Sequence, residues 1–212
     1  YGMGAAVIPH VSNLRPLRVF SGPHFTGASA LLSQYTAYAG ASLGSMNRAI
    51  SSLELKRGYM ATVAANENGT GASRCYIAQD ADLEVSVLPA ALDNRISFVR
   101  VFPWRWVSKK GIAGDIWRNL NVGWYYNWNL NQNSSRDLEY VPIKQNRWWP
   151  NLAQDWRARG INHLLGFNEP DHPDQADMTV DQAINSWPEL LGTGLRVGAP
   201  AVTDGGADWL YS

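Results

Sequence analysis

The sequence predicts a chain of two parts, an all-β antiparallel sandwich followed by an α/β part with a parallel sheet. A motif with a period of about 45 residues is repeated in the first half, which favours a sandwich built from two similar units. All ten tryptophans lie at or after Trp104, so the two halves differ sharply in aromatic content. From Lys109 onward, apolar runs alternate with polar loops and helical stretches, a pattern typical of parallel sheets.

Composition excludes several classes of protein. The chain of 212 residues is 45% hydrophobic and carries 18 basic and 18 acidic residues, so it has no bulk charge that would attract nucleic acid. No run approaches about 18 apolar residues, and no membrane span is expected. The single Cys75 excludes an intrachain disulfide and a cysteine metal cluster. Because the chain opens at Tyr1, we expect a processed or trimmed N-terminus. A secreted, extracellular location is also expected.

The first half contains the repeat. Residues 17–55 and 60–101 read as two copies, each with short strand-like runs separated by turn residues. The matching strings are Phe25-Thr-Gly-Ala-Ser29 with Gly69-Thr-Gly-Ala-Ser73, and Asn47-Arg-Ala-Ile-Ser-Ser-Leu-Glu-Leu55 with Asn94-Arg-Ile-Ser-Phe-Val-Arg-Val101. These copies resemble the βγ-crystallin Greek-key pair. The resemblance implies a double Greek-key domain at 17–102, preceded by an N-terminal segment at 1–16.

In the crystallin family a closing Asn/Asp-Asn/Asp-x-x-Ser/Thr-Ser loop binds calcium through oxygen ligands. The resemblance therefore implies a possible calcium site at Asp93, Asn94 and Ser97, where Phe98 replaces the last serine. The equivalent loop of the first copy has Arg48 at its second amide or acidic position, which opposes a cation there. Loops that only close the Greek key are the alternative in both copies.

The second half alternates strands and helices. A junction at 102–108 lacks a Gly/Ser-rich linker, so the two parts are expected to pack against each other. Strands are predicted at 109–114, 122–127, 139–144, 163–168 and 195–199, and helices at 148–159 and 179–192. Thr179 is an N-cap for the second helix, and Gly192 and Gly194 end it.

The loops after these strands are rich in amides, aromatic rings and acids. They contain Tyr126-Asn127-Trp128, Trp148-Trp149, Asn168-Glu169 and Asp204. The carboxyl ends of parallel strands share one edge, where α/β barrels place their active sites. These side chains suit a neutral, polyhydroxylated ligand, whereas a phosphate site would need Gly-rich turns or basic clusters. A helix start with Asn168 as its N-cap is the alternative for that stretch.

Four strings in this half resemble glycoside hydrolase family 128, a group of β-1,3-glucanases in the retaining (β/α)8 clan. They are Tyr126-Asn-Trp128, Val141-Pro142, Leu164-Leu-Gly-Phe-Asn-Glu-Pro-Asp171 and Gly198-Ala-Pro-Ala201. The resemblance covers 109–212 and implies a TIM barrel of which this chain holds the first five strands. By this resemblance Glu169 is the general acid/base, and Asn168 binds the 2-hydroxyl of the reacting sugar. The resemblance further implies that Tyr126, Asn127, Trp128, Trp148 and Trp149 bind substrate.

Retaining hydrolysis requires a second carboxylate about 5–5.5 Å from the first. By the resemblance this nucleophile is a glutamate after the seventh strand, beyond Ser212. The missing strands belong to a longer chain or to a second chain, or the chain is a non-catalytic binder. Within the sequence Asp204 is the best substitute, and its alternative role is a loop turn before Gly205 and Gly206.

The sequence therefore predicts a glycosidase that hydrolyses β-1,3-glucan in the endo mode, and the chain as it stands reads as an incomplete enzyme. The expected partner is a β-glucan polysaccharide or oligosaccharide, with no nucleic acid and no membrane. No cofactor is required, and calcium is possible in the first domain. The alternatives are a non-catalytic β-glucan-binding protein and a calcium-binding, crystallin-like structural module.

Overall fold

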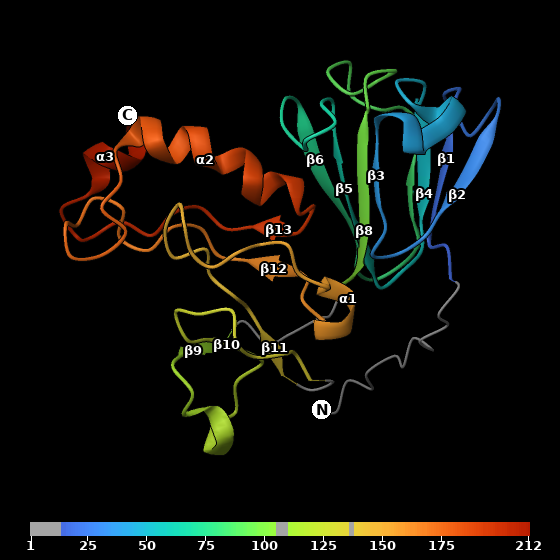
Figure 1. The fold of residues 1–212 in the computed structure, drawn as a ribbon. Coiled ribbons are helices and arrows are strands. Elements are labelled where there is room, and N and C mark those ends of the chain that lie inside the picture. The colour runs from blue at the N-terminus through green and yellow to red at the C-terminus, as the bar shows by residue number, and fades with distance from the viewer. Residues whose placement is uncertain (1–13, 105–109, 136–137) are drawn as a thin grey trace.

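A computed structural model describes residues 14–104, 110–135 and 138–212 (Figure 1). Most of the predicted N-terminal segment, at 1–13, and the junction residues 105–109 lie outside the described residues. In the described part a β-sandwich is followed by a half in which strands and helices alternate. None of the described helices is long and apolar enough to cross a membrane.

The sandwich consists of two four-stranded antiparallel sheets, in the orders β2-β1-β4-β7 and β3-β8-β5-β6. Its strands are β1 (Leu17–Phe20), β2 (Ser29–Leu32), β3 (Ala37–Ala39), β4 (Ser52–Leu55), β5 (Tyr59–Ala64), β6 (Ser73–Ala78), β7 (Leu83–Val85) and β8 (Phe98–Pro103), with a 3-10 segment η1 at Gly40–Met46. Each copy of the repeat gives one strand to the other copy's sheet, β3 in one direction and β7 in the other. The predicted duplicated antiparallel sandwich is therefore confirmed.

Alternation along the strands divides the apolar side chains between two cores. On β5, Tyr59, Ala61 and Val63 lie in the first core, inside the sandwich. Met60 belongs to the second core, which is formed mainly by the other half of the chain. Because successive side chains of a strand point to opposite faces, this sheet is apolar on both faces.

The second half contains a set of short parallel strands, as predicted. These are β9 (Gly111–Ala113), β10 (Trp124–Tyr126), β11 (Glu139–Tyr140), β12 (His163–Leu164) and β13 (Arg196–Val197). β9, β10 and β11 pair in parallel, as do β12 and β13. A parallel bridge between Ile143 and Leu165 joins the two groups, and a further bridge links Asn168 with Ala201. The strands thus follow one another in sequence order, although each is shorter than predicted.

Helix α2 (Val180–Gly192) agrees with the prediction at both ends. The Thr179 side chain accepts the backbone N–H of Gln182, whose side chain accepts the N–H of Thr179. The chain leaves the helix through Gly194, whose φ of 69° lies in the left-handed region that glycine tolerates. Two short elements complete the half, η2 (Trp117–Asn119) and α3 (Ala207–Tyr211).

The helix predicted over 148–159 is wrong for most of its length, because only α1 (Trp156–Arg159) forms. The Asn146 side chain accepts the backbone N–H groups of Trp148 and Trp149, and Asn151 accepts that of Ala153. These local bonds compete with helical ones, and Pro150 disfavours a helical residue before it.

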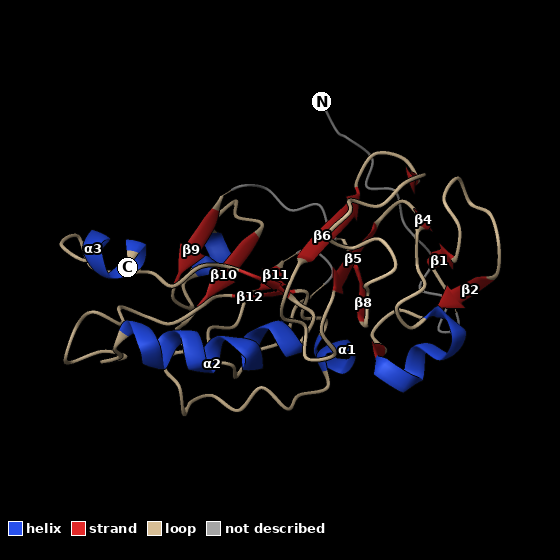
Figure 2. Ribbon diagram, turned by 90° about the horizontal axis from the view of Figure 1, so that it is seen from above, coloured by secondary structure: helices blue, strands red, loops and turns tan. Residues whose placement is uncertain are grey.

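Helix α2 lies above β12 and β13 in the view of Figure 1, and Figure 2 shows the same helix from above. The Phe167 ring, at the end of this strand layer, contacts Trp187 of the helix edge-on, with 5.7 Å between centroids. Leu164 and Leu190 are fully buried in the same core. Helix α2 therefore covers one face of the β12–β13 layer.

The sandwich and the second half share the second core, in agreement with the packing predicted from the lack of a Gly/Ser-rich linker. Met60 and Phe102, both 0% exposed, project from the sandwich sheet into that core. The Thr62 hydroxyl donates to the Gly194 carbonyl at 2.7 Å. A Cβ on Gly194 would lie only 2.5 Å from the Arg100 side chain, so this contact requires glycine.

Candidate active site

The loops at the carboxyl edge of the parallel strands lie side by side, because backbone hydrogen bonds connect each to the next. The bonds run from Ile143 N to Asn129 O (3.2 Å), from Asn168 N to Gln145 O (3.1 Å) and from Glu169 N to Ala201 O (2.7 Å). The structure therefore brings the loops that carry Trp128, Trp148, Trp149, Glu169 and Asp204 to one edge.

Glu169 stands at the end of the strand layer with a partly exposed side chain. Its φ of 44° lies in the left-handed region, so the backbone turns sharply at this residue. The turn is closed by the His172 N–H, which donates to the Glu169 carbonyl at 3.0 Å. Pro170, directly after it, is buried. The carboxylate thus leaves a rigid turn rather than a mobile loop.

Asn168 is 9% exposed and is held on both sides. Its Nδ2 donates to Gln175 Oε1 at 2.9 Å, and its carbonyl accepts the Ala176 N–H at 3.1 Å. Gln175 orients the amide beside Glu169, a role that sequence reasoning missed. Gln175 lies in an irregular polar loop, where no periodic sequence pattern indicates which residue bonds to Asn168.

Asp171 is the second acid of the turn, and it is engaged by the loop after β13. The backbone N–H and the hydroxyl of Thr203 both donate to its carboxylate. The Thr203 hydroxyl, aided by the Thr203 N–H, lowers the pKa of Asp171 from its ordinary value. Asp204, the predicted substitute nucleophile, lies next to Thr203 and is exposed.

Asn127 is fixed by protein groups rather than left open. The Tyr140 hydroxyl donates to its Oδ1 at 2.7 Å, and its Nδ2 donates to Asn131 Oδ1 at 2.9 Å and to Asp115 Oδ1 at 3.1 Å. Burial raises the pKa of Tyr140 to about 12, so this phenol stays a donor. Asp115 follows β9 and was also missed, because a lone acid after a short strand carries no distinctive pattern.

Three indole rings at this edge are accessible. Trp128, Trp148 and Trp149 are 44%, 66% and 43% exposed. Trp128 contacts Tyr126 edge-on, with 5.1 Å between ring centroids. Aromatic rings gathered on one exposed edge are typical of a binding surface, and their flat faces suit sugar rings.

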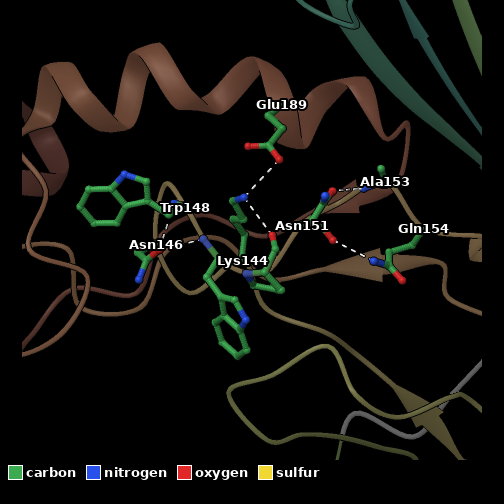
Figure 3. A network of polar contacts seen from close by, with 9 residues as sticks. Lys144, Asn146, Trp148, Asn151, Ala153, Gln154 and Glu189 are labelled. Atoms are coloured by element: carbon green, nitrogen blue, oxygen red, sulfur yellow. Dashed lines mark hydrogen bonds and ion pairs between the residues drawn. The ribbon is translucent and has the colours of Figure 1, made fainter.

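Lys144 is a further residue that the sequence did not single out. It directly follows Ile143 at the edge, yet its side chain is buried between the strand layer and α2 (Figure 3). Its Nζ donates to the Pro150 carbonyl at 2.9 Å and to Glu189 Oε1 at 3.1 Å.

The predicted calcium ligands are only partly available. The buried Ser97 hydroxyl donates to Asn47 Oδ1 of the other copy at 2.7 Å, and Asn94 Nδ2 lies 3.3 Å from Asp93 Oδ1. Asp93 is then the one carboxylate of the predicted site. Calcium prefers six to eight oxygen ligands, so this set of ligands is weak. Among the described residues no group of three or more His, Cys, Asp or Glu side chains could hold a metal. The calcium site stays a prediction.

The histidine of the strand before the turn has a structural partner. His163 Nδ1 lies 2.6 Å from Glu139 Oε1, and the Glu139 side chain is 2% exposed. This pair lies at the start of β11 and β12, away from Glu169 at the opposite end of the strand layer. Two hollows, of about 630 and 510 Å³, also lie elsewhere, and Glu169 lines neither. The exposed tryptophans and the partly exposed Glu169 make the site an open edge.

Comparison with known proteins gives matches for both halves. A βγ-crystallin domain from Flavobacterium johnsoniae is 30% identical, covering 41% of this chain and 93% of its own, with a TM-score of 0.36. A mutant of a GH128 (subgroup I) endo-β-1,3-glucanase from Amycolatopsis mediterranei, in complex with laminaripentaose, is 34% identical, with a TM-score of 0.41. That match covers 48% of each chain, so this chain spans about half the length of that glucanase. No curated protein matches the chain.

A family model described as the glycosyl hydrolase catalytic core matches residues 104–212. This range includes the Asn168-Glu169 turn and the loops with the exposed tryptophans. The glycosidase resemblance that the sequence indicated for the second half is thereby confirmed at the level of the family. Because the match covers slightly more than half of the 212 residues, the chain belongs to the glycosyl hydrolase catalytic core family.

Proposed function

We propose that this chain is part of a retaining, endo-acting β-1,3-glucan hydrolase in which Glu169 is the general acid/base. The observation that carries the proposal is the position of Glu169, partly exposed at the carboxyl end of the parallel strands and next to Asn168. The family match supports glycoside hydrolysis as the reaction class. The β-1,3 linkage rests on the resemblance of the Gly166-Phe-Asn-Glu-Pro-Asp171 string.

The proposed chemistry uses Glu169 twice. Its carboxylic acid protonates the glycosidic oxygen as the bond to the leaving sugar breaks, and its carboxylate later takes a proton from the attacking water. Gln175 holds the Asn168 amide. In the proposal this amide binds the 2-hydroxyl, a contact that strengthens in the transition state. The nucleophile is a glutamate expected beyond residue 212.

A (β/α)8 barrel is the proposed fold of the complete domain. Parallel strands that neighbour each other in sequence order support it, because a barrel sheet is built in this order. Such a barrel needs about 250 residues, so further strands must come from more of the chain or from a second chain. Those strands would supply the opposite wall of the groove above the open edge.

The test is an assay of the full-length protein and its Glu169→Gln variant on a soluble β-1,3-glucan. Loss of the general acid/base should lower kcat by roughly 10²–10⁴-fold, while binding of the glucan is retained. Binding without cleavage by the unaltered protein would instead support a non-catalytic β-glucan-binding protein, which the exposed tryptophans also favour. A protein that neither cleaves nor binds the glucan would contradict both.

A further inference from the structure

Lys144 occupies an unusual environment for a lysine, since the whole residue is 1% exposed. Its backbone belongs to the strand layer, where the Lys144 N–H donates to the Leu165 carbonyl at 3.0 Å. Its side chain points toward the last turns of α2, where Glu189 lies (Figure 3). Removing an ammonium from water costs several kcal/mol, so such a group is retained only where partners compensate it.

The partners of the ammonium come from two different elements. Glu189 of α2 supplies a carboxylate oxygen at 3.1 Å, and its own side chain is 45% exposed. The Pro150 carbonyl lies at 2.9 Å, six residues further along the same loop. One cation thus closes the neck of the 144–150 loop and ties that neck to the helix.

The loop above this neck is rigid by its own bonds. Asn146 Oδ1 accepts the N–H groups of Trp148 and Trp149, at 3.0 and 2.9 Å. The Asn146 N–H in turn donates to the Trp149 carbonyl at 3.0 Å. The backbones of Trp148 and Trp149 are therefore held together in one loop, and the neck sets the position of that loop.

The same loop touches the residue next to the proposed acid/base. Gln145 lies between Lys144 and Asn146 in the chain, and its carbonyl accepts the Asn168 N–H at 3.1 Å. A shift of the neck would therefore change the distance between the indoles and Glu169. A misplacement of about 1 Å can lower the rate of an enzyme by roughly 10²-fold.

We propose that Lys144 and Glu189 are positioning residues. Their ion pair fixes the Trp148–Trp149 loop relative to Glu169 and so determines how tightly this loop binds the sugar chain. The inference rests on the proposed function and adds a role for two residues that do not touch substrate. The loop binds sugar units next to the bond that is cleaved, so the pair governs affinity for longer chains.

The test uses the full-length protein carrying Glu169→Gln, in which binding is measured by calorimetry without turnover. The probe is a β-1,3-linked glucose pentasaccharide. Lys144→Met should weaken binding by about tenfold, since it keeps the volume of the side chain but removes the donors. Glu189→Gln, at an accessible position, should also weaken binding, but by less. It provides the test of the ion pair if Lys144→Met does not fold. Asp181→Asn, an exposed change on the same helix, is the matched control and should bind normally.

A second comparison separates positioning from a general loss of structure. In a background that also carries Trp148→Ala and Trp149→Ala, Lys144→Met should cause no further loss, because the platform that it positions is gone. Equal losses with and without the two indoles, or unchanged binding in Lys144→Met and Glu189→Gln, would overturn the inference while leaving the proposed function intact. Failure of the unaltered protein to bind or cleave the sugar would refute the proposed function and the inference together.

Discussion

At the scale of single residues, the site depends on side chains that orient others. Asn168 and Glu169 were predicted because four consecutive residues, Asn-Glu-Pro-Asp, follow an apolar run. Gln175, Asp115 and Lys144 were not predicted. Their partners lie up to 45 residues away, as for Lys144 and Glu189, and no local spacing records such a contact.

Gln175→Ala tests whether the Asn168 amide must be held. The substitution removes the 2.9 Å bond to Asn168 Nδ2, and the side chain is exposed, so the fold should tolerate it. We expect kcat/KM on the glucan to fall by about tenfold with little change in Tm, as for loss of an orienting hydrogen bond. Asp174→Asn is a neighbouring control that should keep full activity. Normal kcat/KM in Gln175→Ala would show that the amide needs no such support.

The Asp171–Thr203 contact gives a prediction about pH. Because the pKa of Asp171 is lowered in the folded protein, its contribution to stability is present above its unfolded pKa of about 3.9. That contribution is lost as the pH falls through the lower folded pKa. Thr203→Val should lower Tm at pH 6, and the difference from the unaltered protein should shrink as the pH falls below about 4. A difference that stays constant down to pH 2 would show that the carboxylate plays no part.

At the scale of elements, prediction succeeded where the signals are local. Thr179 marks the start of α2 and the glycines mark its end, because capping involves residues only a few positions apart. The helix expected from residue 148 failed, since Asn146 and Asn151 use their side chains to hold a loop instead. Both are turn-forming residues, but aromatic and apolar neighbours masked that signal.

Thr179→Ala tests the capping of α2. Loss of the capping side chain should lower the free energy of unfolding by about 1 kcal/mol, as is usual for an N-cap. Thermal or denaturant unfolding measures the change. Thr179→Ser keeps a capping hydroxyl and should retain most of the stability that Thr179→Ala loses. An unchanged midpoint for Thr179→Ala would mean that α2 is held by packing alone.

At the scale of the whole molecule, the sequence predicted two parts that pack together but not the surface between them. The pattern of a strand shows which residues point to each face of its sheet. It does not show which part of the chain packs against a second apolar face. The structure supplies the answer, since Met60 and Phe102 reach from the sandwich into the core under α2.

Met60→Ala should therefore destabilise the second half as well as the sandwich. Truncation of a fully buried methionine typically costs about 2–5 kcal/mol. Tryptophan fluorescence reports on the second half, because all ten tryptophans lie at or after Trp104. Met46→Ala, in the first core, is the matched control and should shift the fluorescence transition less. Equal shifts for the two variants would argue against a shared core.

The role of Glu169 is tested most directly by comparing substrates that differ in their need for an acid. In the full-length protein, Glu169→Gln should lower kcat/KM on β-1,3-glucan by about 10³-fold, because the sugar leaving group must be protonated. On an aryl β-glucoside with a strongly acidic phenol, which leaves without a proton, kcat/KM should fall by less than about tenfold. Equal losses on both substrates would contradict the assignment of Glu169 as the general acid.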